Sequence, residues 1–155
     1  MAAGTITSNL YASGQQAASV YPGTFKKVVG SIVIPANTSF ATTDILKMCQ
    51  FPGPATFFDD FIIDLPALDG GSGLTWSMVD TLASPTTFFT ANTTGQAAGW
   101  IATTASTHGT LGANTNGGTG YASGIELRLV PSHASTSTTG AAALTIYFEV
   151  GYHNG

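Results

Sequence analysis

The chain has 155 residues, and only 8% of them are charged: four are Lys or Arg and eight are Asp or Glu. The formal net charge of −4 and the scarcity of basic side chains argue against a nucleic-acid partner. No run of apolar residues is long enough to cross a membrane as a helix, so we expect no membrane partner. The single cysteine, Cys49, excludes an internal disulfide.

So few charges indicate a building block of a larger assembly. The surface of a free protein is typically about a quarter to a third charged. A surface without those charges must be hydrated by hydroxyl groups or covered by other copies of the chain. Residues 1–8 lack the basic and apolar regions of a secretory signal, so we expect synthesis and assembly in a cytoplasm.

Residues 1–24 are small and polar and show neither helical nor strand periodicity, and Pro22-Gly23 closes them with turn-forming residues. We predict an extended N-terminal arm here, held by the chain's own sheet or by a neighbouring subunit. Its larger apolar side chains are candidate interface residues: Leu10, Tyr11, Val20 and Tyr21.

From residue 25 onward, short apolar or alternating segments are separated by Gly, Pro and Asn residues. The predicted strands are Phe25–Ile34, Ile45–Phe51, Phe57–Leu65, Leu74–Val79, Ala97–Thr104, Tyr121–Val130 and Ala142–Tyr152. A less regular segment around Phe88 adds an eighth strand or, since Ser84-Pro85 favours a helix start, a short helical turn over Ser84–Thr94. The Gly-rich segment 105–120 is predicted to be an exposed loop.

This pattern predicts an all-β protein, in which residues 25–155 form one antiparallel β-sandwich. Regular short strands with turn chemistry between them are typical of sandwiches and barrels. A jelly-roll of about eight strands is the leading architecture, with the arm of residues 1–24 as a separate unit.

The sequence contains no arrangement typical of a catalytic or metal site. His108, His133 and His153 lie in two predicted loops and a tail, without a second ligand at metal-binding spacing. Asp60 and Asp64 share one strand face about 13 Å apart, whereas a glycosidase pair needs about 5 to 9.5 Å. We therefore predict no enzyme activity, no metal and no cofactor.

The aromatic residues allow two interpretations. Trp76 and Trp100 could form a platform for glycans, because flat rings stack on sugar faces, but tryptophans on sandwich strands are more often core or interface anchors. Tyr147 and Tyr152 are candidate residues of a subunit interface, where tyrosine is enriched.

Several segments together resemble small structural proteins of tailed bacteriophages. The resemblance covers residues 41–152 and consists of turn and strand patterns: Ala41–Met48, Pro52–Ala55, Phe61–Gly71, Leu74–Asp80, Phe88–Gly99 and Leu144–Tyr152. It implies a virion component assembled in the host cytoplasm, foremost a decoration (cement) protein on the outside of the capsid. Its implied partners are two further copies in a homotrimer and the major capsid protein. A tail, collar or fibre component and a carbohydrate-binding module remain the alternatives.

Overall fold

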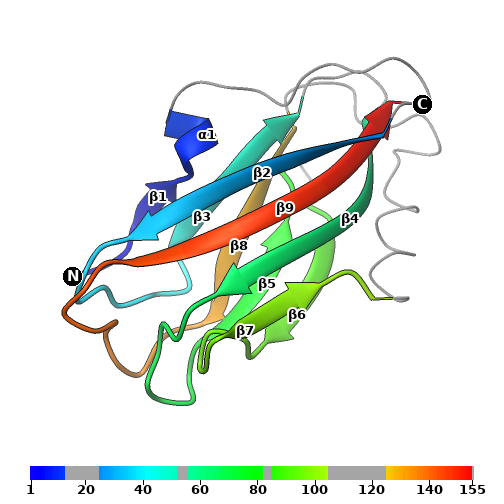
Figure 1. Ribbon diagram of the computed structural model, residues 1–155. Helices are drawn as coiled ribbons and strands as arrows, with labels where there is room; N and C mark the ends of the chain where they lie inside the picture. Colours follow the sequence, from blue (N-terminus) through cyan, green and yellow to red (C-terminus); the bar gives the residue numbers. More distant parts are fainter. Residues whose placement is uncertain (13–24, 52–55, 82–84, 105–124, 155) are drawn as a thin grey trace.

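The computed structural model describes residues 1–12, 25–51, 56–81, 85–104 and 125–154. These residues form nine strands and one short helix (Figure 1). The elements are β1 (Thr5–Thr7), α1 (Asn9–Ala12), β2 (Phe25–Ile34), β3 (Ile45–Phe51), β4 (Thr56–Leu65), β5 (Thr75–Val79), β6 (Thr87–Asn92), β7 (Gly99–Ala102), β8 (Ile125–His133) and β9 (Leu144–Asn154). No helix among the described residues has the length and apolar composition needed to cross a membrane.

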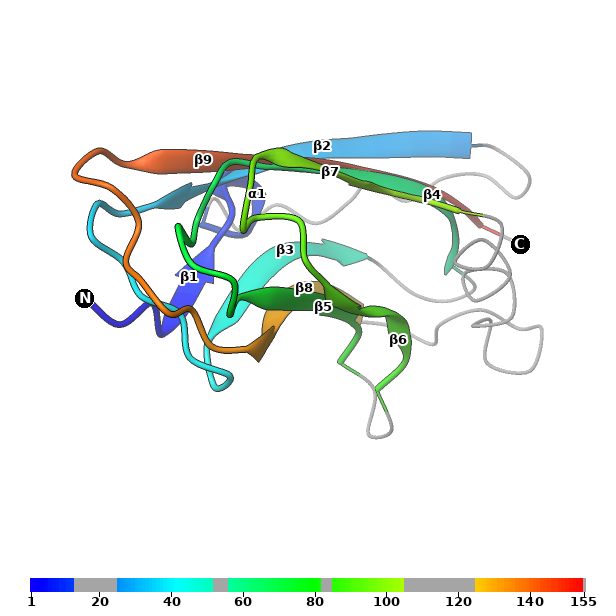
Figure 2. The ribbon, with the colours of Figure 1, turned by 90° about the horizontal axis from the view of Figure 1, so that it is seen from below.

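The strands form two sheets that face each other, as the edge-on view in Figure 2 shows. One sheet has four strands in the order β2-β9-β4-β7, and the other has five in the order β1-β3-β8-β5-β6. All neighbouring strands are antiparallel except β1 and β3, which are parallel. The prediction of an all-β, antiparallel β-sandwich is therefore confirmed.

The strand order also bears on the jelly-roll prediction. Successive strands from β2 to β5 alternate between the sheets, β6 pairs with β5 in the same sheet, and β9 returns to lie between β2 and β4. Likewise β8 returns to lie between β3 and β5. Such returns are the long connections of Greek keys, and a jelly-roll contains two of them. This order favours the jelly-roll, which stays an interpretation.

A continuous hydrophobic core fills the space between the sheets. Alternate residues of the long strands supply it because successive side chains of a strand point to opposite faces. The largest fully buried side chains are Trp76, Tyr152, Phe51, Phe61, Ile32, Ile34, Leu46, Met48, Ile63, Leu65 and Leu68.

A β-bulge in β4 changes which side chains reach the surface. Phe58 and Phe61 are both buried, although strict alternation would place them on opposite faces. The register against β9 shifts between Phe58 and Asp60, so Asp59 is an extra residue in β4. As a result, Asp59 and Asp60 are both half-buried at the surface, next to each other.

The first twelve residues lie on the chain's own domain. Strand β1 extends the five-stranded sheet by pairing with β3, and Ile6 and Leu10 pack against the core. In α1, the Asn9 side chain accepts a hydrogen bond from the Ser31 backbone of the edge strand β2, at 2.8 Å. These residues close one side of the sandwich. Residues 13–24 lie outside the described residues, and the domain boundary at residue 24 stays a prediction.

The structure corrects the expected element in the middle of the chain and the places of two histidines. The optional helical turn over 84–94 is wrong, because residues 87–92 form strand β6. His133 and His153 lie in β8 and β9 and not in a loop and a tail. Strand β8 continues past Pro131, which pairs only with β5, since the pairing of β8 with β3 ends at Leu129.

Candidate interaction surface

The solvent-facing side of the four-stranded sheet carries most of the large hydrophobic side chains that are exposed in the described residues. We call this side the outer face. Of the seven large hydrophobic side chains that are exposed in the described residues, all but Met1 lie on it. They are Phe25, Val29 and Val33 from β2, Ile62 from β4, Trp100 from β7 and Tyr147 from β9.

The strand register joins these side chains into rows across the sheet. Val29, Glu149 and Ile62 form one row, because Glu149 pairs with both of the others. Tyr147, Asp64 and Trp100 form the next, since Asp64 pairs with Tyr147 on one side and with Trp100 on the other. Contiguous exposed apolar side chains, unlike single scattered ones, are typical of interaction sites.

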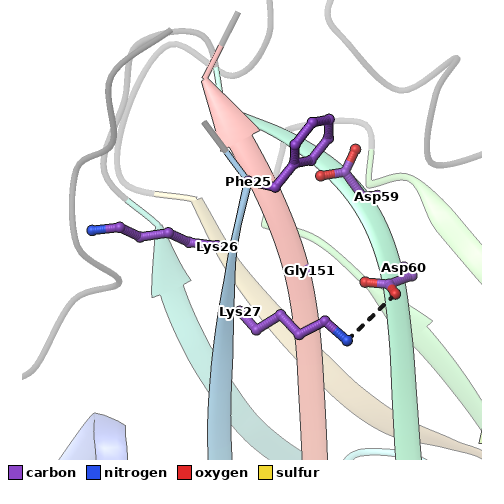
Figure 3. Close-up of a pocket in the computed structure, with 6 residues that line it drawn as sticks. All are labelled: Phe25, Lys26, Lys27, Asp59, Asp60 and Gly151. Carbon is purple, nitrogen blue, oxygen red and sulfur yellow. Dashed lines mark ion pairs between the residues drawn. The ribbon is translucent and has the colours of Figure 1, made fainter. Parts of the chain in front are cut away.

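One end of the outer face carries a group of paired charges. The Lys27 ammonium lies 2.5 Å from a Glu149 carboxylate oxygen and 3.9 Å from Asp60, and Figure 3 shows the second pair. The hydrogen bond to Glu149 and the negative charge of Asp60 raise the pKa of Lys27 above its ordinary value. Gly151 makes this arrangement possible, because a Cβ at its position would lie 1.9 Å from an Asp60 carboxylate oxygen.

A pocket of about 300 Å³ adjoins these ion pairs, lined by Phe25, Lys26, Lys27, Asp59, Asp60 and Gly151. The Asp59 carboxylate lies 2.8 Å from Nδ1 of His153, whose ring packs against Phe25. The pocket therefore combines an aromatic ring with charged side chains, of which Lys27, Asp59 and Asp60 already have partners. Lys26 projects away from the pocket in Figure 3.

A second group of charges lies on the opposite side of the molecule, beneath α1. Glu126 is buried and accepts hydrogen bonds from the Tyr11 hydroxyl and from Nε of Arg128, and Lys47 lies 3.8 Å away. Burial alone would raise the pKa of Glu126, but these hydrogen bonds and positive charges lower it. The Tyr11 hydroxyl also accepts a hydrogen bond from Gln50. This group fixes α1 to the five-stranded sheet.

The predicted interface residues are placed apart from one another. Leu10 packs against the core, and Tyr11 is half-buried in the group around Glu126. Tyr147 is 56% exposed on the outer face, whereas Tyr152 is 2% exposed and packs against Phe51. Val20 and Tyr21 lie outside the described residues. Tyr152 cannot reach another chain while the core is intact, so we leave it out of the interfaces proposed below.

The two predicted glycan platforms also differ. Trp76 is completely buried, with its ring against Phe40 in an edge-to-face contact, so it offers no platform. Trp100 is 72% exposed on the edge strand β7. The outer face also includes residues that sequence reasoning missed, namely Phe25, Val29, Val33 and Ile62. The sequence could have indicated the residues of β2, because this strand has apolar residues at odd as well as at even positions and therefore on both of its faces.

No group of three or more metal-ligating side chains occurs in the part of the chain that the structure describes. Cys49 is buried, and burial raises the pKa of its thiol. His133 contacts the Thr75 hydroxyl at 3.2 Å, and His108 lies outside the described residues. The described residues thus offer an exposed surface for contact and no group of side chains that could hold a metal ion.

Comparison with known proteins finds similar folds among solved structures but no match to the sequence. No protein-family model and no curated protein matches the sequence. A chain in the structure "Capsid of Ralstonia phage GP4" is similar with a TM-score of 0.67 and 18% identity, over 97% of this chain and 98% of that one. The chain shares its fold with a phage capsid component.

A second solved structure extends the likeness to a cyanophage. A chain in "Cyanophage Pam1 capsid asymmetric unit" is similar with a TM-score of 0.58 and 18% identity. The match covers 93% of this chain and 96% of that chain. Both likenesses therefore include the whole sandwich and not a single motif.

Proposed function

We propose that the chain is a non-enzymatic structural protein of a phage virion, and more narrowly a decoration (cement) protein on the outside of the capsid. The observation that carries the proposal is the fold shared with a chain of the Ralstonia phage GP4 capsid over nearly the full length of both. The likeness to a chain of the cyanophage Pam1 capsid adds to it.

The outer face gives this proposal a physical basis. Burying apolar surface against a partner contributes about 25 cal/mol per Å², and a cement protein repeats that contribution at every copy on a particle. The outer face has exposed branched and aromatic side chains for such a contact. The net charge of −4 also suits a position outside the shell better than one against packaged DNA.

The partners that we propose are the major capsid protein and two further copies of this chain in a homotrimer. Val20 and Tyr21 are the proposed contacts between copies, and Tyr147 belongs to the surface that faces the shell. Deleting residues 1–24 is a poor test of these contacts, because Ile6 and Leu10 pack against the chain's own core. Such a deletion would disturb the sandwich itself.

Labelling of intact virions tests the proposal directly. An antibody raised against the purified chain, coupled to gold, is applied to virions of the phage that encodes it and viewed by negative-stain electron microscopy. We expect gold on the outside of DNA-filled heads. Gold on tails, collars or fibres would favour the alternative virion position. An absence of label, together with an absence of the chain from the virion by mass spectrometry, would refute the virion assignment.

A carbohydrate-binding module is the second candidate, favoured by one observation. Trp100 is 72% exposed, and Tyr147 is exposed two strands away, so both rings are free to stack on sugar faces. Binding to a glycan array that Trp100→Ala abolishes would support it. Trp76→Ala is not a useful companion variant, because it would remove a buried core side chain.

A further inference from the structure

The row formed by Tyr147, Asp64 and Trp100 places one carboxylate between two exposed aromatic rings. Asp64 lies in β4, the strand between β9 and β7, and is directly opposite Tyr147 and Trp100 in the register. Directly opposed side chains in antiparallel strands have Cβ atoms about 4.5–5.5 Å apart. Tyr147 and Trp100 are 56% and 72% exposed, and Asp64 is also exposed. The carboxylate is therefore flanked on both sides by accessible rings.

Asp64 differs from every other acidic residue of the chain. All eight acidic residues lie in the described parts, and seven have partners there. Asp44, Asp69 and Asp80 accept hydrogen bonds from backbone N–H groups, Glu126 is held by Tyr11 and Arg128, Asp59 contacts His153, and Asp60 and Glu149 pair with Lys27. Asp64 has neither an ion pair nor a hydrogen bond within the described residues.

We propose that this row binds an arginine side chain of a partner polypeptide. A guanidinium group donates two parallel hydrogen bonds to a carboxylate and also stacks on aromatic rings. A lysine ammonium is compact and strongly hydrated, and it makes no bidentate contact. The arrangement of Asp64 between Tyr147 and Trp100 offers both interactions of arginine at once. That the polypeptide is a shell protein rests on the proposed function; its arginine chemistry does not.

A second copy of the chain does not fit as the occupant of the outer face. Asp60, Asp64 and Glu149 outnumber Lys27 on this face, so two copies face to face would repel each other. Lys47 and Arg128 are already held by Glu126. Lys26 is then the one basic side chain without a partner in the described residues, and it lies on β2, the far edge of the sheet from β7. The positive charge must come from another protein.

A glycan fits the surrounding surface less well than a polypeptide does. The neighbouring exposed side chains Val29, Val33 and Ile62 cannot hydrogen-bond to sugar hydroxyls. Burying hydroxyl groups against them without hydrogen bonds would be unfavourable. The apolar side chains around an arginine on a protein surface would instead gain from the contact. An interface core of aromatic residues around an arginine is typical of binding hot spots.

The chemistry is tested with two blocked pentapeptides that differ only in a central arginine or lysine between leucines. They are titrated into ¹⁵N-labelled protein while the two indole N–H resonances are followed by NMR. We expect the Trp100 signal to shift saturably with the arginine peptide, and the buried Trp76 signal to stay in place as an internal control. Affinity for the lysine peptide should be several-fold lower. Equal affinities, or no saturable shift, would overturn the proposal.

Asp64→Asn is the decisive variant and Asp60→Asn is its matched control. Each removes one negative charge from the same face without changing the side-chain shape, and Lys27 keeps Glu149 in the control. We expect Asp64→Asn to weaken binding of the arginine peptide by about tenfold, the effect of losing a charge-assisted hydrogen-bonded pair. Asp60→Asn should change it little. Equal losses would show a general effect of charge and would refute the specific site.

The same variants, added to DNA-filled heads that lack the chain, separate this proposal from the proposed function. Asp64→Asn should attach about tenfold more weakly than wild type and Asp60→Asn nearly as well as wild type. If wild-type protein decorates heads but Asp64→Asn attaches equally well, the arginine site is wrong while the function stands. If the arginine peptide binds but no wild-type chain attaches to heads, the site stands and the cement role fails.

Discussion

Asp69 provides the sharpest test of how the sandwich is held together. Its carboxylate is completely buried and accepts hydrogen bonds from four backbone N–H groups, those of Gly71, Leu74, Thr136 and Ser137, each at 3.0 Å. Each carboxylate oxygen accepts two of them. The residue thereby joins the loop before β5 to the loop after β8.

Replacing Asp69 with asparagine should destabilise the fold substantially. An amide has one acceptor oxygen, so in either orientation its NH₂ group would face two backbone donors. Leaving a buried donor unsatisfied costs about 1–3 kcal/mol, so two such donors cost about 2–6 kcal/mol. The whole domain is expected to have about 5–15 kcal/mol of stability. Urea unfolding at pH 7 should show the loss as a lower midpoint with an unchanged slope.

Asp64→Asn is the control for Asp69→Asn, since Asp64 is exposed and has no partner in the described residues. It should change the free energy of unfolding by less than about 0.5 kcal/mol. A comparably small effect of Asp69→Asn would refute the reasoning, because the four hydrogen bonds would then contribute nothing net.

The pH dependence of the same pair gives an independent check. Burial alone would raise the pKa of Asp69, but the hydrogen bonds from Ser137, Thr136, Gly71 and Leu74 lower it below its ordinary value. The stabilisation is therefore complete above the unfolded-state pKa of about 4 and is lost as the pH falls through the lower folded-state pKa. The stability gap between wild type and Asp69→Asn should narrow as the pH is lowered from 4. A gap that stays constant would contradict this assignment.

Three further predictions concern packing and reactivity. Gly30→Ala would place a Cβ 2.5 Å from the Phe148 ring and should cost about 1–3 kcal/mol in urea unfolding, as overpacking does; no loss would contradict this packing. Tyr11→Phe removes the hydroxyl that contacts buried Glu126 and should cost about 1–3 kcal/mol, with faster amide exchange in β1. Cys49, buried and with a raised pKa, should react with a thiol reagent only after unfolding; rapid native-state labelling would contradict its burial.

Much of the sandwich could be predicted because its long strands are bounded by clear signals. The predicted bounds of β2 and β3 agree with the structure, since in the sequence Pro35 follows one strand and the strand-breaking residues Pro52 and Gly53 follow the other. β1 was missed because its three residues have no periodicity and pair only through the fold. The bulge at Asp59 was also invisible, since it is defined by the register against a strand about ninety residues later.

The alternation of side chains along a strand predicts which of them are buried. Tyr152 shares the parity of Ile146, Phe148 and Val150 in β9, and that parity predicts the burial that the structure shows. The prediction that Tyr152 lies at an interface did not take this alternation into account. The row around Asp64 could not be found in the same way. Finding it requires the register of β9, β4 and β7, and the order of these strands in the sheet cannot be read from any local sequence pattern.

The few charged side chains of this protein have specific roles, which their hydrogen-bond and ion-pair partners within the chain show. The chain uses three aspartates to bind backbone N–H groups in its loops, and Glu126 to hold α1, so half of its acidic residues serve the inside of the fold. Lys47 and Arg128 are held by Glu126 as well. The outer face is left with Lys27 between two carboxylates, a set of apolar side chains and Asp64. Asp64 is the acidic residue of this face that has neither an ion pair nor a hydrogen bond in the described residues, and it lies between two exposed rings that can bind a cation, which is a favourable place for specificity toward a partner.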